Sequence, residues 1–205
     1  MMLKILVATA ILACATMAAS AASVAKTYSY FSIGGSTLDE IEADIAKRGP
    51  HVKSSGKRHP GATQMEFTTR LTYRESRGRC EVVKADVTVR AKVILPRWKR
   101  NKKADRDVRL IWDTLESDIK RHEESHVGIA KNHARELEQA LMAIGRQRDC
   151  TIAGAKAKAA SARILNAHDR AQAAFDRVEG INFESRILRL LRYRMERIED
   201  GRLPG

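Results

Sequence analysis

A chain of 205 residues, 43% hydrophobic and 31% charged, has enough apolar side chains for one modest core and is too short for several large domains. Its formal net charge of +13 favours anionic partners such as acidic proteins, phospholipid headgroups and envelope polymers. Composition therefore narrows the class of partner and identifies no function.

The first 21 residues have the features of a secretory signal peptide. Lys4 provides the positive start, residues 5–19 are almost wholly apolar and small, and residues 19–21 form a small-residue cleavage site. The apolar run is too short for a transmembrane helix, and the residues before Cys14 resemble a lipoprotein cleavage box only loosely. We expect residues 22–205 to form a single domain exported to the periplasm or the medium. Its anionic partner is then an envelope surface or an acidic substrate, with no nucleic acid expected.

The first half of the mature chain, residues 22–98, predicts a small sheet with a short helix. Residues 27–33 are aromatic and β-branched and predict a strand. Thr37 and Glu40 form a capping box that opens a helix to about Lys47. Apolar and polar side chains alternate in residues 65–73 and 83–95, so these segments are expected to pair as an antiparallel hairpin.

Residues 96–103 interrupt the alternation with a proline, Trp98 and several basic side chains. A solvated linker is the favoured interpretation. The alternative is a polyanion-binding patch in which Trp98 stacks on the ligand.

The second half, residues 105–198, predicts helices. One long helix is expected to span residues 105–147. Its apolar side, which should face the core, is formed at steps of three or four residues by Ile111, Leu115, Ile119, His122, His126, Ile129, His133, Leu137, Leu141 and Ile144. An alanine-rich helix then runs to about residue 177, and a last helix, at about residues 183–198, carries five arginines. We favour a docked last helix with a basic outer face over one that lies on a membrane. The predicted fold class is α+β: a small antiparallel sheet packed on a long helix and C-terminal helices.

The long helix contains the motif H-E-x-x-H at residues 122–126. His122 and His126 are four residues apart, so both imidazoles can bind one ion, and zinc accepts neutral imidazole readily. Glu123 can then act as the base that deprotonates a metal-activated water, which is the chemistry of peptide hydrolysis. Three core histidines that bond to nearby carbonyls would be the structural alternative. Burying three imidazoles on one side of a helix is costly unless something pairs with them. A metal ion is a natural partner, so we favour a metal site.

A third zinc ligand is expected from the helix that follows. The position six residues after His126, where metzincins have a histidine, holds Asn132. His133 lies about 10 Å along the helix axis, too far to share the ion, and is expected to support the site or belong to the core.

If the chain reverses near Thr151, a residue about 25 positions beyond the turn returns opposite His126. That residue is Asp176, and Glu179 lies one turn further on. We rank Glu179 and Asp176 first as ligands and His168 after them. Surface carboxylates near a helix end are the alternative interpretation for both.

Of the three cysteines, Cys14 is expected to leave with the signal segment. Cys80 and Cys150 then remain as an even pair in a compartment that permits oxidation, which predicts a disulfide between them.

Several of these segments resemble an uncharacterised bacterial family described as predicted secreted zinc-dependent proteases. The resemblance rests on residues 28–38, 61–63, Cys80, residues 95–98 and the motif at residues 122–126. It implies a zincin-like peptidase with His122 and His126 as ligands and Glu123 as base, acting on a peptide or protein. Relatives in that family have a histidine in this region of the chain, and in this sequence Ile181 occupies its place. The alternative function is a non-catalytic envelope protein, with a binding or structural role, that retains the helix.

Overall fold

The computed structural model describes residues 22–52 and 55–203, so the predicted signal segment with Cys14 lies outside the described residues. The described part has both helices and sheets, which confirms the α+β prediction. In chain order its elements are β1 (Ser23–Ile33), α1 (Leu38–Arg48), β2 (His51–Val52), β3 (Lys57–Arg58), β4 (Ala62–Ser76), β5 (Arg79–Trp98), α2 (Arg106–Met142), α3 (Cys150–Ile181) and α4 (Phe183–Glu199).

The main sheet has the strand order β1-β5-β4, so β5 is central and the other two strands form the edges. β4 and β5 make the predicted antiparallel hairpin, in which Ser76 pairs with Arg79 across a two-residue turn. Arg77 and Gly78 have φ angles of 52° and 65°, the left-handed backbone that such a tight turn requires. β1 pairs with β5 in parallel, so the sheet is mixed. A purely antiparallel sheet was predicted. Parallel pairing of β1 with β5 needs a long connection between them, and α1, the β2–β3 hairpin and β4 provide it.

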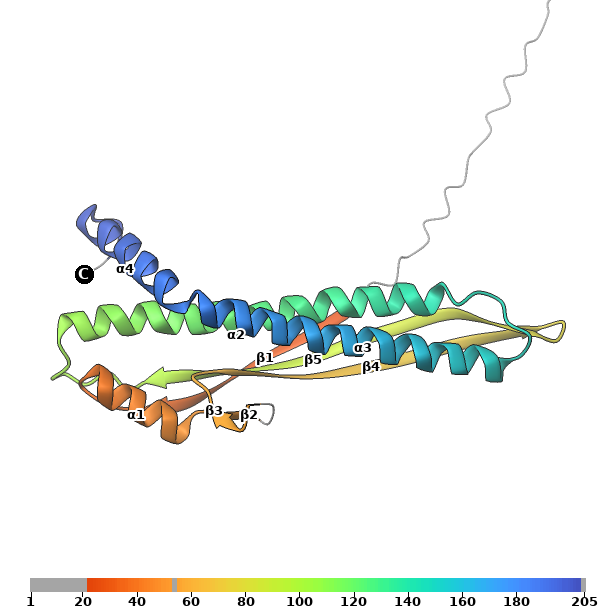
Figure 1. Cartoon of the computed structure of the whole chain (residues 1–205), viewed down its shortest axis with the longest axis horizontal. Helices are drawn as coiled ribbons and strands as arrows, with labels where there is room; N and C mark the ends of the chain where they lie inside the picture. The colour runs from red at the N-terminus through yellow and green to blue at the C-terminus, as the bar shows by residue number, and fades with distance from the viewer. Residues whose placement is uncertain (1–21, 53–54, 204–205) are drawn as a thin grey trace, which may run out of the picture.

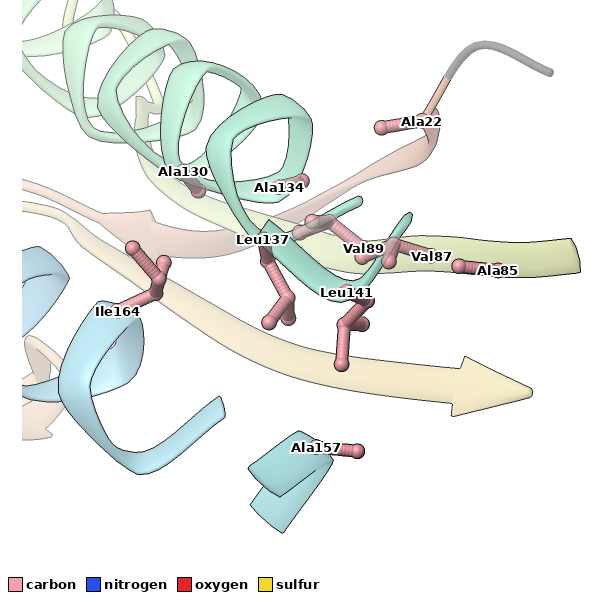
Figure 2. Packing of buried hydrophobic residues seen from close by; sticks show 10 residues of the cluster. All are labelled: Ala22, Ala85, Val87, Val89, Ala130, Ala134, Leu137, Leu141, Ala157 and Ile164. Carbon is pink, nitrogen blue, oxygen red and sulfur yellow. The ribbon is translucent and has the colours of Figure 1, made fainter. Parts of the chain in front are cut away.

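One face of the sheet is covered by α2, with α3 running beside α2 in the opposite direction (Figure 1). The side chains of β5 alternate, and those facing the helices are almost fully buried: Ala85, Val87, Val89, Ala91 and Val93 have 2% exposure or less. Ala85, Val87 and Val89 form a core with small and branched side chains of α2 and α3 (Figure 2): Ala130, Ala134, Leu137, Leu141, Ala157 and Ile164. Ala91 and Val93 pack in a neighbouring cluster with Val127 of α2. Alanine at this contact allows α2 to lie close to the sheet.

A second cluster closes the end of the molecule where α2 begins. It contains Ile33, Ile41, Trp98 and Trp112. Trp98 has only 6% exposure, and its indole Nε1 donates to the carbonyl of Gly35 over 3.1 Å. The suggestion that Trp98 stacks on a polyanion is therefore wrong, because its ring is part of the core.

The helical boundaries differ from prediction at two glycines. α2 ends at Met142, before Gly145, which has a φ of 66° and turns the chain. α3 begins at Cys150, where the Asp149 side chain accepts a hydrogen bond from the backbone N–H of Ile152, and it continues through Gly154. None of the helices in the described residues is both long enough and apolar enough to cross a membrane.

The buried stripe of α2 is offset from the predicted one. Its buried members include Glu123, Val127, Ala130 and Ala134, while the predicted stripe members His122 and His126 are only half-buried. The reason is that α2 contacts two partners, the sheet and α3. The histidines lie on the side of α2 that faces α3.

Cys80 and Cys150 form the predicted disulfide, with Cα atoms 5.0 Å apart. It joins the start of β5 to the start of α3. Backbone hydrogen bonds between Cys80 and Gln147 support the same junction. The link holds the beginning of α3 against the sheet.

Candidate metal centre

Three donor atoms from α2 and α3 converge on one point. The Nε2 atoms of His122 and His126 are 3.1 Å apart. Asp176 Oδ1 lies 3.3 Å from the first and 3.1 Å from the second. His122 and His126 are one turn apart on α2, and α3 brings Asp176 to them at the register predicted for a helical hairpin.

The spacing of these donors fits a zinc ion. Ligands about 2.0–2.1 Å from zinc at tetrahedral angles lie about 3.3 Å from one another. Two imidazole nitrogens and one carboxylate oxygen are also a typical donor set of catalytic zinc sites, which leave a fourth position open. The ligand atoms of these three residues all lie within 4.8 Å of one another, close enough to share one metal ion.

The partners of the other ring nitrogens favour this use. His126 Nδ1 is 2.6 Å from Gln172 Oε1, and His122 Nδ1 is 3.6 Å from Glu179 Oε2. Oxygen atoms at both Nδ1 positions favour the tautomer with the proton there and the lone pair on Nε2. The lone pairs of the two Nε2 atoms and the carboxylate of Asp176 then face one point. These groups repel one another unless a cation lies between them.

The protonation of His122 also suits a metal ligand. Burial lowers the pKa of His122, and the neighbouring His126 lowers it further, although Asp176 and Glu179 act in the opposite direction. A lowered pKa keeps the imidazole neutral at neutral pH, the form that binds metal.

Glu123 lies on the side of α2 that faces β4. Thr63 Oγ1 donates to Glu123 Oε2 over 2.8 Å, and the residue is 5% exposed. Burial raises the pKa of Glu123, and Asp176 raises it further, while the Thr63 hydrogen bond and His126 partly offset this. A carboxylate with a raised pKa is a better proton acceptor near neutral pH than an exposed glutamate.

The close approach of β4 to Glu123 depends on Gly61. A Cβ atom at this position would lie 2.8 Å from Glu123 Oε1 and 2.9 Å from Ile119 Cγ2. Real side chains do not tolerate such contacts, so the glycine allows the start of β4 to rest on the site. Gly61 and Thr63 both belong to residues 61–63, one of the segments that carry the family resemblance.

The three converging residues and Glu123 line a cleft of about 680 Å³. Its walls come from the β2–β3 hairpin, the start of β4, α2, α3 and the start of α4. Much of its surface is apolar, contributed by Val52, Pro60, Ala62, Met65, Ile119 and Phe183. A cleft of this size and character is typical of small-molecule and peptide sites.

Glu179, the other predicted carboxylate ligand, belongs to an ion-pair network next to the donors. Its carboxylate contacts Arg121 and, over 3.4 Å, Arg186 of α4. Both arginines also bind the buried Asp118, with nitrogen–oxygen distances of 2.9 and 3.1 Å. Burial alone would raise the pKa of Asp118, but the two arginines outweigh it, so the pKa is lowered. The network joins α2, α3 and α4 beside the cleft.

The remaining predicted site residues lie further along the same seam. The ring of His168 lies edge-on against that of His133, with ring centroids 5.8 Å apart. Neither histidine is among the three converging residues. His168 Nε2 is instead 2.8 Å from Gln172 Nε2. Gln172 thereby links His168 to His126.

Sequence reasoning missed Gln172 and Phe175. Phe175 lies against both imidazoles, with ring centroids 4.9 Å from His122 and 5.1 Å from His126. A signal for Gln172 was present, because His168, Gln172 and Asp176 recur at four-residue steps on an otherwise alanine-rich helix.

Replacing Gln172 by leucine is expected to weaken zinc binding by about 10–100-fold, the usual effect of removing a partner of a metal-binding histidine. The substitution removes the oxygen that accepts from His126 Nδ1. Competition with a colorimetric zinc chelator measures the affinity. Gln64→Leu, on the exposed face of the sheet, is the matched control, and Gln172→Glu should restore part of the affinity. Equal zinc affinity in Gln172→Leu and Gln64→Leu would contradict the assigned role.

A family model described as bacterial protein of unknown function (DUF922) matches residues 28–184. The match runs from β1 into α4 and includes every residue of the candidate centre. No curated protein and no solved structure matches the chain.

Proposed function

We propose that this chain, which belongs to the bacterial family of unknown function DUF922, is a zinc-dependent peptidase. The observation that carries the proposal is the triangle of donor atoms from His122, His126 and Asp176, with sides of 3.1, 3.3 and 3.1 Å. Its sides match those expected around a tetrahedral zinc ion. The resemblance to predicted secreted zinc proteases supports the same assignment.

In this proposal His122, His126 and Asp176 hold the zinc ion. When bound, zinc would supply Lewis-acid activation of a water molecule and of the scissile carbonyl. Glu123 accepts the proton from the water and later passes it to the leaving amine. Thr63 holds one oxygen of Glu123 in place, and burial keeps the pKa of the carboxylate raised for this exchange. Glu179 and Gln172 hold the two imidazoles from behind.

The cleft suits an extended peptide. β4 is an edge strand, and its first residues, including Ala62 and Met65, line the cleft beside the donors. An edge strand can hydrogen-bond to the backbone of an added chain without regard to its sequence. Apolar residues such as Ile119 and Phe183 then contact the substrate side chains. We therefore expect a polypeptide substrate with apolar side chains next to the cleaved bond.

Export is part of the same proposal. The chain begins with the features of a signal segment, and Cys80 and Cys150 form a disulfide. Disulfides persist mainly in oxidising compartments such as the bacterial periplasm. We place the protein in the periplasm or the medium on these grounds.

The test is cleavage of a diverse peptide mixture, analysed by mass spectrometry, with the protein as purified, after chelation, and after zinc is restored. Cleavage that disappears with chelation and returns with stoichiometric zinc is the expected result. Stoichiometric zinc without any cleavage would instead favour the alternative, an envelope protein that binds without turnover. Cleavage that persists after complete zinc removal would contradict the proposal.

A further inference from the structure

The connection from β5 to α2 carries a concentration of positive charge. Between positions 97 and 109 seven basic side chains are exposed, against the two acidic ones of Asp105 and Asp107. The basic residues are Arg97, Lys99, Arg100, Lys102, Lys103, Arg106 and Arg109. We call this segment, residues 97–109, the basic end. It lies at the end of the molecule where α2 begins (Figure 1).

Little of this charge is neutralised within the molecule. Arg100 pairs with Asp113 over 2.5 Å, and Arg109 donates to the carbonyl of Ala104 over 2.8 Å. Among the described residues, the side chains of Lys99, Lys102 and Lys103 have no ion-pair partner. Three unpaired lysines in one short connection attract anions from solution.

Helix α4 places apolar side chains beside the basic end. A groove of about 500 Å³ separates the start of α2 from α4, and Arg106, Arg109, Met195 and Ile198 line it. Met195 is 48% exposed, and Leu188, seven residues earlier and therefore on the same side of the helix, is 58% exposed. Acidic side chains of Asp107, Asp113 and Glu199 also line the groove, so most of the excess positive charge lies on the loop beside it and not in the groove itself.

We propose that the basic end and the exposed side of α4 bind the surface of an anionic phospholipid bilayer. Lysines and arginines of residues 97–109 would contact the headgroup phosphates, while Leu188 and Met195 enter the interface between headgroups and acyl chains. Basic residues together with exposed apolar side chains are the combination that membrane-surface elements use. A soluble polyanion would use the charges and leave the apolar side chains in water, so the bilayer accounts for more of the surface.

The basic end is distant from the candidate metal centre. His122 lies sixteen residues beyond Arg106 on α2, a rise of about 24 Å. Helix α4 connects the two regions, because Phe183 and Arg186 at its start line the cleft. The proposal does not depend on zinc binding or on peptide cleavage.

The experiment is co-sedimentation of the mature protein with vesicles of phosphatidylcholine alone and with vesicles that also contain phosphatidylglycerol. We expect binding to the anionic vesicles at low salt and its loss at about 0.5 M salt, where charges are screened over a few ångströms. The triple variant Lys99→Glu, Lys102→Glu, Lys103→Glu should bind at least about tenfold more weakly, since each basic residue contributes roughly a factor of five.

The matched control reverses three exposed basic residues of α3, Lys156, Lys158 and Arg163, which leaves the same net charge. These residues lie in the first half of α3, towards the opposite end of the molecule (Figure 1). The control should retain most of the binding. Leu188→Ser with Met195→Ser should weaken binding that remains at intermediate salt. Circular dichroism establishes that each variant is folded.

Three results would overturn the proposal: no binding to anionic vesicles at low salt, equal loss of binding in both triple variants, or binding to polyphosphate but not to vesicles. Loss of vesicle binding together with intact zinc content would leave the peptidase proposal standing. The two proposals can therefore fail separately.

Discussion

Replacing Glu123 by glutamine is expected to lower the rate of peptide cleavage by about 10²–10⁴-fold while zinc content stays the same. Glutamine keeps the shape of the side chain, and its amide can still bond to Thr63, which contacts one carboxylate oxygen at 2.8 Å. It cannot accept a proton from water. Steady-state cleavage of a peptide found in the mixture screen, together with metal analysis of the same sample, measures both quantities.

The neighbouring residue provides the control. Glu124 has the same side chain but accepts hydrogen bonds from Tyr28 and Lys26 of β1, away from the cleft. Glu124→Gln should therefore keep cleavage close to that of the unaltered protein. If both substitutions reduced cleavage alike, or if neither did, Glu123 would not be the base.

Removing the disulfide by the double substitution Cys80→Ser, Cys150→Ser is expected to lower the free energy of unfolding by about 4 kcal/mol. The bridge closes a loop with a sequence separation of 70 residues, and the loss of chain entropy in the unfolded state grows with loop length. Urea unfolding of the oxidised protein and of the variant, followed by circular dichroism, measures the difference.

The same variant separates the stability of the fold from zinc binding at the candidate metal centre. Asp176 lies about 39 Å along α3 from Cys150, so the bridge does not contact the site. In buffer where the variant remains folded, zinc affinity should be unchanged. A variant as stable as the parent would show that packing of α3 on the sheet, and not the bridge, holds this end together.

Local sequence signals predicted most of the architecture. The alternation in β4 and β5 reflects one face on the helices and one in solvent, and a two-residue turn at Arg77 and Gly78 completes a hairpin whose pairing is local. The parallel pairing of β1 with β5 was not predictable in the same way. It joins segments far apart in the chain, and strand alternation does not encode the direction of the neighbour.

The geometry of the candidate metal centre was partly predictable. Spacing alone placed His122 and His126 together, and helix rise placed Asp176 opposite them. The same arithmetic does not choose between Asp176 and Glu179, which are almost one turn apart. The side chains of Arg121 and Arg186 distinguish them, because they contact Glu179 and leave Asp176 to the imidazoles.

The offset of the buried stripe has a related cause. A helix that packs against two partners has a wide buried face. The pattern of apolar residues in its sequence does not show which part of that face contacts the sheet and which part contacts α3. The acidic residues Glu123 and Glu138 are buried in α2, whereas Ile129 and Leu115 are only half-buried. Glu138 accepts a hydrogen bond from the backbone N–H of Ala22, and Glu123 one from Thr63. A backbone donor just before β1 and a side-chain donor on β4 make these positions acceptable.

The most direct test of the account is the zinc stoichiometry of the purified protein and of single histidine variants, measured by metal analysis after dialysis. The account predicts one zinc ion per chain, its loss in His126→Ala, and its retention in His133→Ala, a histidine of the same helix that contacts His168 and not the three converging donors. A protein that binds no zinc, or one that retains it equally in both variants, would contradict the central claim that His122, His126 and Asp176 form a metal site.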